Sequence, residues 1–279
     1  MLDKITYLNC KNEKVVFGEN GIFITECGLM DYDWNVEKEN NKISDLKKGL
    51  KTKNITVSIK GNSIEDGVNK RNKIFEIFEK DVLLRKCGKI IIGDYYLQCY
   101  IIDSQKSRYI KDSNYLVIKL KIIPEYPYWC HEETKSFLRY NEMIEKSVDD
   151  YLLYPFSYPY RYSMPRNAGF IQNDHYAPCD FQMIVYGPCT DPSVRIDGHL
   201  YEVITTLYSG EYMVIDSRDN TVTKYKNDGS TENLYNSRRK DIRVFEKIPS
   251  GRLSVLWNIE AFGFDITLFQ ERSEPKWSL

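Results

Sequence analysis

Apolar and polar residues alternate in short runs through the second half of this 279-residue chain, and turn residues separate the runs. Phe181, Met183 and Val185 alternate with polar or smaller neighbours until Tyr186-Gly187-Pro188 ends the run. Alternation at period two is typical of strands that bury one face. The pattern predicts strands at 181–185, 194–196, 200–207, 213–216, 221–225, 243–245, 253–257 and 264–270, with turns at 197–198, 219–220 and 249–251. Strands at this spacing indicate an antiparallel β-sandwich.

The first 129 residues combine strands with one helix. Ser63 followed by Asp66 forms an N-terminal capping box. The residues that then fall on one stripe at helical spacing are Val68, Arg71, Ile74, Phe75, Phe78 and Val82. Strands are predicted at 5–8, 15–17, 22–26, 55–59, 83–86, 89–92, 95–103 and 115–123. This order predicts an α+β domain whose helix packs on a mostly antiparallel sheet.

Residues 31–50 break this pattern because they are rich in Lys, Glu and Asn and have few apolar positions. We expect a long exposed loop there. Loops of this length in a strand-dense domain usually serve binding or assembly. Two interpretations stay open, a contact between subunits and a mobile hairpin without a role.

Proline and aromatic residues mark the domain boundary. Pro124, Pro127 and Trp129 close the first domain, because proline cannot donate to a sheet. A short helix is possible at 137–146, and the aromatic, proline-rich residues 154–162 form an extended connector. We therefore predict domains at 1–129 and 166–279 with a linker at 130–165. The aromatic rings of the linker pack either on another subunit or over the seam between the two domains.

Composition excludes some classes of function but does not identify a particular one. The aromatic share of 14%, with 22 tyrosines, favours strands, and the net charge of −1 gives no support for nucleic-acid binding. The seven cysteines include no C-x-x-C pair, which favours free thiols in a reducing compartment. The sequence has no signal peptide or membrane-length apolar run, so we expect synthesis in a cytoplasm and no membrane partner.

The sequence predicts no catalytic, cofactor-binding or metal-binding residue, and therefore no enzyme. A nucleophilic triad would have to use His131, His175 or His199, and none of them lies in a nucleophile-elbow sequence. Asp197 and His199 flank a hairpin glycine, which indicates a turn. Zinc ligands would come from Cys179, Cys189 and His175, which lack a regular ligand spacing.

An ordered set of segments resembles one protein family. The set comprises the helix-containing N-terminal region, Pro127-Tyr128-Trp129, the 154–160 connector, Val185-Tyr186-Gly187-Pro188, the 212–216 strand and Ile248-Pro249-Ser250-Gly251. In this order, over nearly the whole chain, the segments resemble the distal tail protein family of siphophages, called Dit.

The resemblance implies a structural protein of the virion tail tip. It implies a tail-tube-like N-terminal β-sandwich with one packed helix, and a C-terminal sandwich similar to galectins or carbohydrate-binding modules. Family members form hexameric rings through their N-terminal domains. The ring joins the tail tube protein to the tail-associated hub protein, and the outward domain supports receptor-binding components. Residues 31–50 match in position the long hairpin at subunit contacts in these rings.

A different function class stays open, a carbohydrate-binding module that attaches to host cell-wall polysaccharide. Sugar rings stack on exposed aromatic side chains, and Trp257, Tyr201 and Tyr208 are the candidates for contact with a carbohydrate or a partner. Alternation in the 253–257 strand points Trp257 towards the core, so packing is its competing role. Unlike the longer members of the Dit family, this chain has no extra module between the strands of the sandwich, and within the resemblance this favours the adaptor role over direct host binding.

Overall fold

The computed structural model describes residues 4–108, 114–139, 168–258 and 261–276 of the chain. It divides into two compact units, Met1–His131 with Glu271–Leu279, and Glu132–Gln270. Both consist mainly of antiparallel strands, and the described residues contain a single α-helix, which confirms the predicted mainly β, α+β class. The division differs from the predicted domains in that the segment from Glu271 joins the first unit. Most of the predicted linker 130–165 lies outside the described residues.

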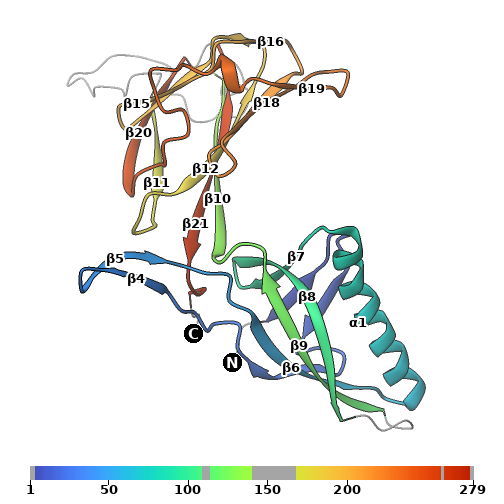
Figure 1. The fold of residues 1–279 in the computed structure, drawn as a ribbon. Helices are drawn as coiled ribbons and strands as arrows, with labels where there is room; N and C mark the ends of the chain where they lie inside the picture. The colour runs from blue at the N-terminus through green and yellow to red at the C-terminus, as the bar shows by residue number, and fades with distance from the viewer. Residues whose placement is uncertain (1–3, 109–113, 140–167, 259–260, 277–279) are drawn as a thin grey trace, which may run out of the picture. The chain divides into compact units, whose positions relative to one another are not determined.

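The first unit contains an antiparallel sheet in the order β3-β6-β9-β8-β7-β1-β2. Its strands are β1 (Ile5–Leu8), β2 (Lys14–Phe17), β3 (Ile22–Cys27), β6 (Lys53–Lys60), β7 (Gly88–Ile92), β8 (Tyr95–Arg108) and β9 (Tyr115–Pro124). The separate two-stranded sheet of β4 (Asn35–Glu39) and β5 (Lys42–Lys47) replaces the predicted 31–50 loop. Figure 1 shows α1 (Ile64–Leu84) along one side of this unit and the β4–β5 hairpin extending from the opposite side.

The capping box predicted for α1 is present. The Asp66 backbone N–H donates to Ser63 Oγ at 3.1 Å, and the Asn62 N–H donates to Asp66 Oδ2 at 2.7 Å. The first bond satisfies a backbone donor that an isolated helix start leaves unpaired, and the second holds the residue before the cap. None of the helices in the described part of the chain is long and apolar enough to span a bilayer.

A buried hydrogen bond fixes how α1 faces the sheet. The Tyr7 hydroxyl donates to Asp81 Oδ2 at 2.5 Å, and the Cys10 N–H donates to Asp81 Oδ1 at 2.8 Å. Burial and the Asp81 carboxylate raise the pKa of Tyr7 far above its ordinary value, so the hydroxyl keeps its proton. A Cβ at Gly88 would stand 2.4 Å from Asp81 Oδ2 and 2.6 Å from the Tyr7 oxygen, so this close packing requires glycine there.

The buried side of α1 therefore differs from the predicted stripe. Its buried residues are Gly67, Ile74, Ile77, Phe78 and Asp81, whereas Val82 is exposed and Phe75 is only half-buried. The stripe prediction placed Val82 inward because it followed helical spacing from Ile74, Phe75 and Phe78 and gave no inward position to Asp81. The polar Asp81 takes the inward position because Tyr7 and Cys10 provide its hydrogen bonds.

The strand predicted at 83–86 is wrong, because α1 continues through Leu84. Arg85 adopts the left-handed conformation with φ of 52° and ends the helix. Its N–H and that of Lys86 donate to the carbonyls of Val82 and Asp81. Helices commonly end on a left-handed residue, and glycine is the usual one, so Arg85 gave no sequence signal.

The second unit packs two antiparallel sheets, which confirms the predicted sandwich. One sheet has the order β19-β18-β17-β12-β21-β10 and the other the order β11-β20-β14-β15, and a small sheet pairs β13 with β16. The strands are β10 (Trp129–Phe137), β11 (Ala168–Asn173), β12 (Asp180–Tyr186), β13 (Cys189–Thr190), β14 (Ser193–Ile196), β15 (His199–Glu202), β16 (Thr206–Leu207), β17 (Tyr212–Asp216), β18 (Thr221–Tyr225), β19 (Thr231–Asn233), β20 (Gly251–Trp257) and β21 (Phe264–Arg272), with a 3₁₀ turn η1 (Tyr235–Ser237).

In the second unit, one predicted strand is wrong and the start of one predicted helix is contradicted. Phe137 ends strand β10 and does not begin a helix, and the rest of the predicted 137–146 helix from residue 140 lies outside the described residues. The predicted strand at 243–245 is a turn, in which the Glu246 N–H donates to the Arg243 carbonyl. Val244 is buried in the core of the second unit, so its apolar character reflects packing without strand pairing.

We predict that Tyr7→Phe lowers the free energy of unfolding of the first unit by about 1–3 kcal/mol. The substitution keeps the ring but removes the hydroxyl that donates to Asp81 Oδ2, and a buried acceptor without its donor carries the desolvation cost. Urea unfolding measures the loss. Tyr100→Phe, at a half-buried β8 position, is the control and should stay within about 0.5 kcal/mol of wild type. Equal effects of the two substitutions would contradict the role of the Tyr7–Asp81 bond.

Candidate functional site

The β4–β5 hairpin is the most exposed structured segment of the first unit, since every residue of both strands is exposed. Asn40 and Asn41 form its two-residue turn, with φ angles of 49° and 60°. Two successive positive φ angles are typical of the tight turns that join antiparallel strands, and asparagine tolerates them better than most residues. The sequence pair Asn40-Asn41 was therefore a hairpin signal within the predicted loop.

The register of the hairpin places three aliphatic side chains on one face. Val36 pairs with Leu46, and Lys38 pairs with Ile43. The register shifts between Glu37 and Lys38, so a bulge on β5 brings Ile43 and Leu46 to the same face although they are three positions apart. Val36, Leu46 and Ile43 are 48%, 52% and 62% exposed. We call these three side chains, together with Lys38, the apolar face of the hairpin.

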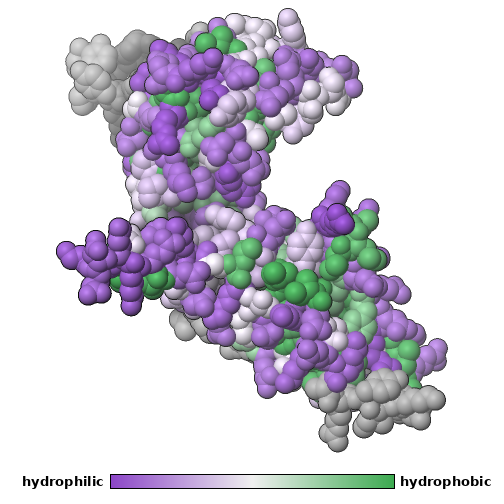
Figure 2. Space-filling model, in the orientation of Figure 1, coloured by the Kyte–Doolittle hydropathy of each residue, from purple (hydrophilic) through white to green (hydrophobic). Residues whose placement is uncertain are grey.

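The opposite face of the hairpin is charged. Lys47 Nζ lies 2.9 Å from Glu37 Oε1 and 3.2 Å from Asp45 Oδ2. These ion pairs are exposed and add little stability, but they keep this face hydrated. Figure 2 shows the hydrophilic surface of the hairpin with hydrophobic colour along its lower edge. An aliphatic patch on a projecting hairpin is typical of a protein–protein contact.

An aromatic box holds the base of the hairpin. Lys48 Nζ lies 4.7 Å from the ring centroid of Tyr128, 5.4 Å from that of Tyr32 and 5.9 Å from that of Trp34. Lys48 Nζ is buried and has no hydrogen-bond partner among the described residues. An ammonium group over aromatic faces is stabilised by the ring quadrupoles, and the attraction is stronger where water is excluded. The box therefore ties the end of β5 to the segment after β9.

Charge and burial act against each other at Lys48. The pKa of Lys48 is lowered to about 8, mainly by burial and also by the Lys53 ammonium, while Asp33 opposes the shift. Asp33 also forms an ion pair with Lys51 at 3.1 Å, and Lys53 Nζ donates to the Asp31 carbonyl at 2.5 Å. The hairpin base is thus a cluster of lysines whose charges are only partly compensated.

Comparisons with known proteins relate the fold to phage tail structures. No family model matches the chain, and no curated protein matches it. Solved structures match over nearly its whole length. One is a chain of the phage P2 baseplate in its activated conformation with Ca, with a TM-score of 0.61 and 13% identity. The match covers 99% of this chain and 100% of the baseplate chain. The phage p2 baseplate with Sr gives a TM-score of 0.61, 14% identity and coverage of 99% and 100%.

The third match carries a protein name. The crystal structure of SPP1 Dit, described as a paradigm of the hub adsorption apparatus in phages that infect Gram-positive bacteria, has a TM-score of 0.61 and 8% identity. The match covers 96% of this chain and 99% of the SPP1 Dit chain. The chain has a Dit-like fold.

In this Dit-like fold, two of the three predicted contact residues are buried. Trp257 is 7% exposed and donates its Nε1–H to the Phe262 carbonyl at 3.2 Å, and Tyr201 is 2% exposed and donates its hydroxyl to the Glu246 carbonyl at 2.9 Å. Tyr208 is 65% exposed. The structure does not bring the three rings together on one surface, and contact with a carbohydrate stays a prediction for Tyr208 alone.

A buried ion pair supports Tyr208. Lys224 Nζ lies 2.8 Å from Glu211 Oε2 and donates to the Thr206 carbonyl at 2.8 Å. The hydrogen bond from Lys224 lowers the pKa of Glu211, and the Tyr208 N–H donates to the same carboxylate oxygen. The Lys224 ammonium lies 5.4 Å from the Tyr208 ring centroid. This network fixes the Tyr208 backbone on the surface of the Dit-like fold.

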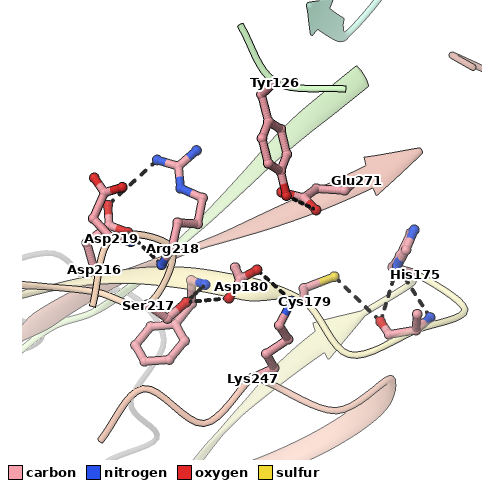
Figure 3. Close-up of polar contacts among 12 residues, drawn as sticks. Tyr126, His175, Cys179, Asp180, Asp216, Ser217, Arg218, Asp219, Lys247 and Glu271 are labelled. Atoms are coloured by element: carbon pink, nitrogen blue, oxygen red, sulfur yellow. Dashed lines mark hydrogen bonds and ion pairs between the residues drawn. The ribbon is translucent and has the colours of Figure 1, made fainter. Parts of the chain in front are cut away.

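The polar groups around Cys179 and His175 serve packing of the Dit-like fold. Cys179 Sγ donates to the Ala177 carbonyl at 3.6 Å, and the Ala177 N–H donates to His175 Nδ1 at 3.3 Å, so thiol and imidazole share a backbone segment without pairing with each other (Figure 3). Asp180 accepts from the Ser217 hydroxyl at 3.0 Å and from Lys247 Nζ at 2.7 Å. These contacts connect β12 with the loops beside it.

The remaining histidines and the zinc candidates also lie apart. His131 Nδ1 is 3.1 Å from the Asp94 carbonyl, and His199 Nε2 is 2.8 Å from the Arg243 carbonyl. Asp197 has φ of 48° in the turn between β14 and β15, as its sequence context predicts. Across the described residues, no group of three His, Cys, Asp or Glu side chains could hold a metal ion.

We predict that the unfolding free energy of the wild type rises relative to that of Lys48→Met as the pH increases from about 8 to 10.5. In this range the folded protein releases the Lys48 proton near pH 8, whereas the unfolded chain holds it to the ordinary pKa of 10.5. The unfolded state then binds more protons, and stability increases with pH. Urea unfolding of both proteins at several pH values measures the difference. Parallel pH profiles would contradict a desolvated Lys48, and Lys51→Met is the control at an exposed lysine.

Proposed function

We propose that this protein is a structural, non-enzymatic component of a phage tail tip that assembles as a ring of identical copies. The carrying observation is the amphipathic β4–β5 hairpin, whose apolar face is about half exposed in the chain on its own. A face of this kind on a projecting element is stabilised when a neighbour covers it. The Dit-like fold supports the same conclusion, because its solved relatives are a Dit protein and chains of phage baseplates.

The number of copies and the neighbours follow from the resemblance to the Dit family. We propose a hexameric ring formed by the first unit, located at the virion tail tip after synthesis in the host cytoplasm. The ring would join the tail tube protein to the tail-associated hub protein, and the second unit would support receptor-binding components. A ring of fixed size requires the same contact between every pair of neighbours, which a surface outside the protein core can provide.

The aromatic box supports this function by orienting the hairpin. A binding element that is already ordered loses less conformational entropy when it meets its partner. Lys48 and the rings of Tyr32, Trp34 and Tyr128 hold the hairpin base. The hairpin is thus presented as a preformed contact.

We predict that Val36→Asp combined with Leu46→Asp raises the concentration at which the oligomer forms by ~30-fold or more, because charges replace two central aliphatic contacts. Light scattering coupled to size-exclusion chromatography measures the mass, and electron microscopy shows whether rings form. Lys42→Asp adds a carboxylate on the opposite face, where Lys42 pairs with Glu39, and should leave assembly unchanged. A wild-type protein that is monomeric at every concentration and shows no rings would overturn the proposal.

A second candidate function, binding of host cell-wall polysaccharide, is favoured by one observation, the exposed Tyr208 ring on its fixed backbone. A single stacked aromatic ring contributes about 1 kcal/mol beyond area burial.

For this second function, Tyr208→Ala should weaken binding to purified cell-wall polysaccharides about tenfold. Isothermal titration measures the affinity, and Tyr235→Ala is the control because that ring is 40% exposed. Absence of binding by the wild type, or equal losses in both variants, would exclude this function for Tyr208.

A further inference from the structure

A second exposed apolar surface lies in the first unit, between α1 and β8. It is a groove with a volume of about 350 Å³, and we call it the α1–β8 groove. The residues that define it are Phe75, Phe78, Glu79, Val82, Ile102 and Asp103. Val82 and Ile102 are 42% and 48% exposed. Figure 2 shows hydrophobic surface over β8 and towards the C-terminal end of α1.

Two local features open this groove. The buried Asp81 turns Val82 and Glu79 towards the edge of α1 rather than into the core. On β8, the register with β9 shifts between Ile101 and Asp103, so Ile102 is the extra residue of a bulge. A bulge redirects the side chain it carries, and here Ile101 is buried while Ile102 is exposed. The exposure of Val82 and Ile102 thus follows from the backbone conformation and not from fraying of an element's end.

The polar groups along the groove leave it with negative charge. Its lining contains the carboxylates of Glu79 and Asp103 and no cationic side chain. Asp103 accepts one bond from Gln105 Nε2 at 3.0 Å, and Ser104 Oγ is buried without a hydrogen-bond partner among the described residues. Lys106, which is outside the lining, lies with its Nζ 4.8 Å from the Phe75 ring centroid. A fitting partner is therefore apolar and carries a positive charge.

We propose that the α1–β8 groove receives the apolar face of the β4–β5 hairpin from a second copy of this chain. The inference rests on the proposed ring assembly and identifies the surface that completes each contact. The hairpin face has the required chemistry, because three aliphatic side chains surround a single charged group, Lys38. Lys38 would meet Glu79 and Asp103 while Val36, Ile43 and Leu46 cover Val82 and Ile102.

The positions of the two surfaces within the first unit determine the kind of assembly. The hairpin extends from one side of this unit and α1 lies along the other (Figure 1). A surface on one side that binds a different surface on the opposite side of the next copy makes a head-to-tail contact. Such contacts repeat from copy to copy and either close into a ring or continue as a filament. A pairwise exchange of identical patches would stop at a dimer.

The experiment uses charge reversal on the full-length protein. Lys38→Glu and Glu79→Lys should each raise the concentration needed for assembly about tenfold, because like charges then face each other at the contact. The double variant Lys38→Glu with Glu79→Lys should assemble at a concentration within about threefold of that of the wild type. Its hairpin and groove again carry opposite charges, with the two signs exchanged. Glu76→Lys reverses a charge on the same helix outside the groove and is the matched control.

Mixing the two single variants separates a contact between copies from a folding defect. In an alternating ring, each altered hairpin meets an altered groove and each native hairpin meets a native groove. The mixture should therefore form rings at a concentration where neither variant does alone, as seen by light scattering and electron microscopy. Circular dichroism confirms that each variant is folded.

The failure of this inference differs from the failure of the proposed function. If Val36→Asp with Leu46→Asp abolishes the ring while Glu79→Lys and Ile102→Asp leave it intact, the groove is not the acceptor and the ring stands. If mixing gives no recovery while both variants are folded, the pairing of Lys38 with Glu79 is overturned. If the wild type forms no oligomer, the proposed function itself fails.

Discussion

The hydrogen bond between Tyr7 and Asp81 is the contact on which the arrangement of the first unit depends. A carboxylate inside an apolar core is costly unless donors surround it, and here the Tyr7 hydroxyl and the Cys10 N–H provide them. The bond joins the last turn of α1 to the first strand across 74 residues of sequence. It fixes the rotation of the helix and therefore decides which of its side chains enter the core and which remain at the surface.

That rotation links the core to the two exposed apolar surfaces of the unit. With Asp81 inside, Ile77 and Phe78 fill the interface with the sheet, and Val82 lies at the edge of the groove. At the other side, the box around Lys48 fixes the base of the hairpin. The orientation of the groove therefore depends on a buried carboxylate, and the hairpin base depends on an ammonium group among aromatic rings.

The sequence predicts the regular parts of this fold well and the irregular parts poorly. Period-two alternation identified strands such as β6 and β12, and Ser63 with Asp66 identified the start of α1. The strands of the β4–β5 hairpin were not predicted from the residue pattern, because the bulge places Ile43 and Leu46 three positions apart and so hides the alternation. Strand β10 was missed because its middle residues are polar and exposed.

The candidate site depended on contacts that no local pattern contains. In the sequence, Trp257, Tyr201 and Tyr208 are all aromatic residues of the predicted sandwich. Only the packed structure shows that Trp257 and Tyr201 are buried and Tyr208 is exposed. The aromatic box joins Lys48 to Tyr128, 80 positions later, and the groove joins a helix to a bulged strand. Tertiary structure determines these contacts between residues distant in the sequence. What the sequence did provide was the position of the unusual segment at 31–50.

The division of the chain places a constraint on how the protein is made. The second unit, Glu132–Gln270, is inserted within the first, which takes up the polypeptide again from Glu271. There the Tyr126 hydroxyl donates to Glu271 Oε2 at 3.0 Å, a bond between residues 145 positions apart. Domains usually fold in the order of synthesis, from the N-terminus onwards. In this chain the ribosome must deliver the whole inserted unit before the first unit acquires its last residues, so a nascent chain cannot present a finished N-terminal unit early.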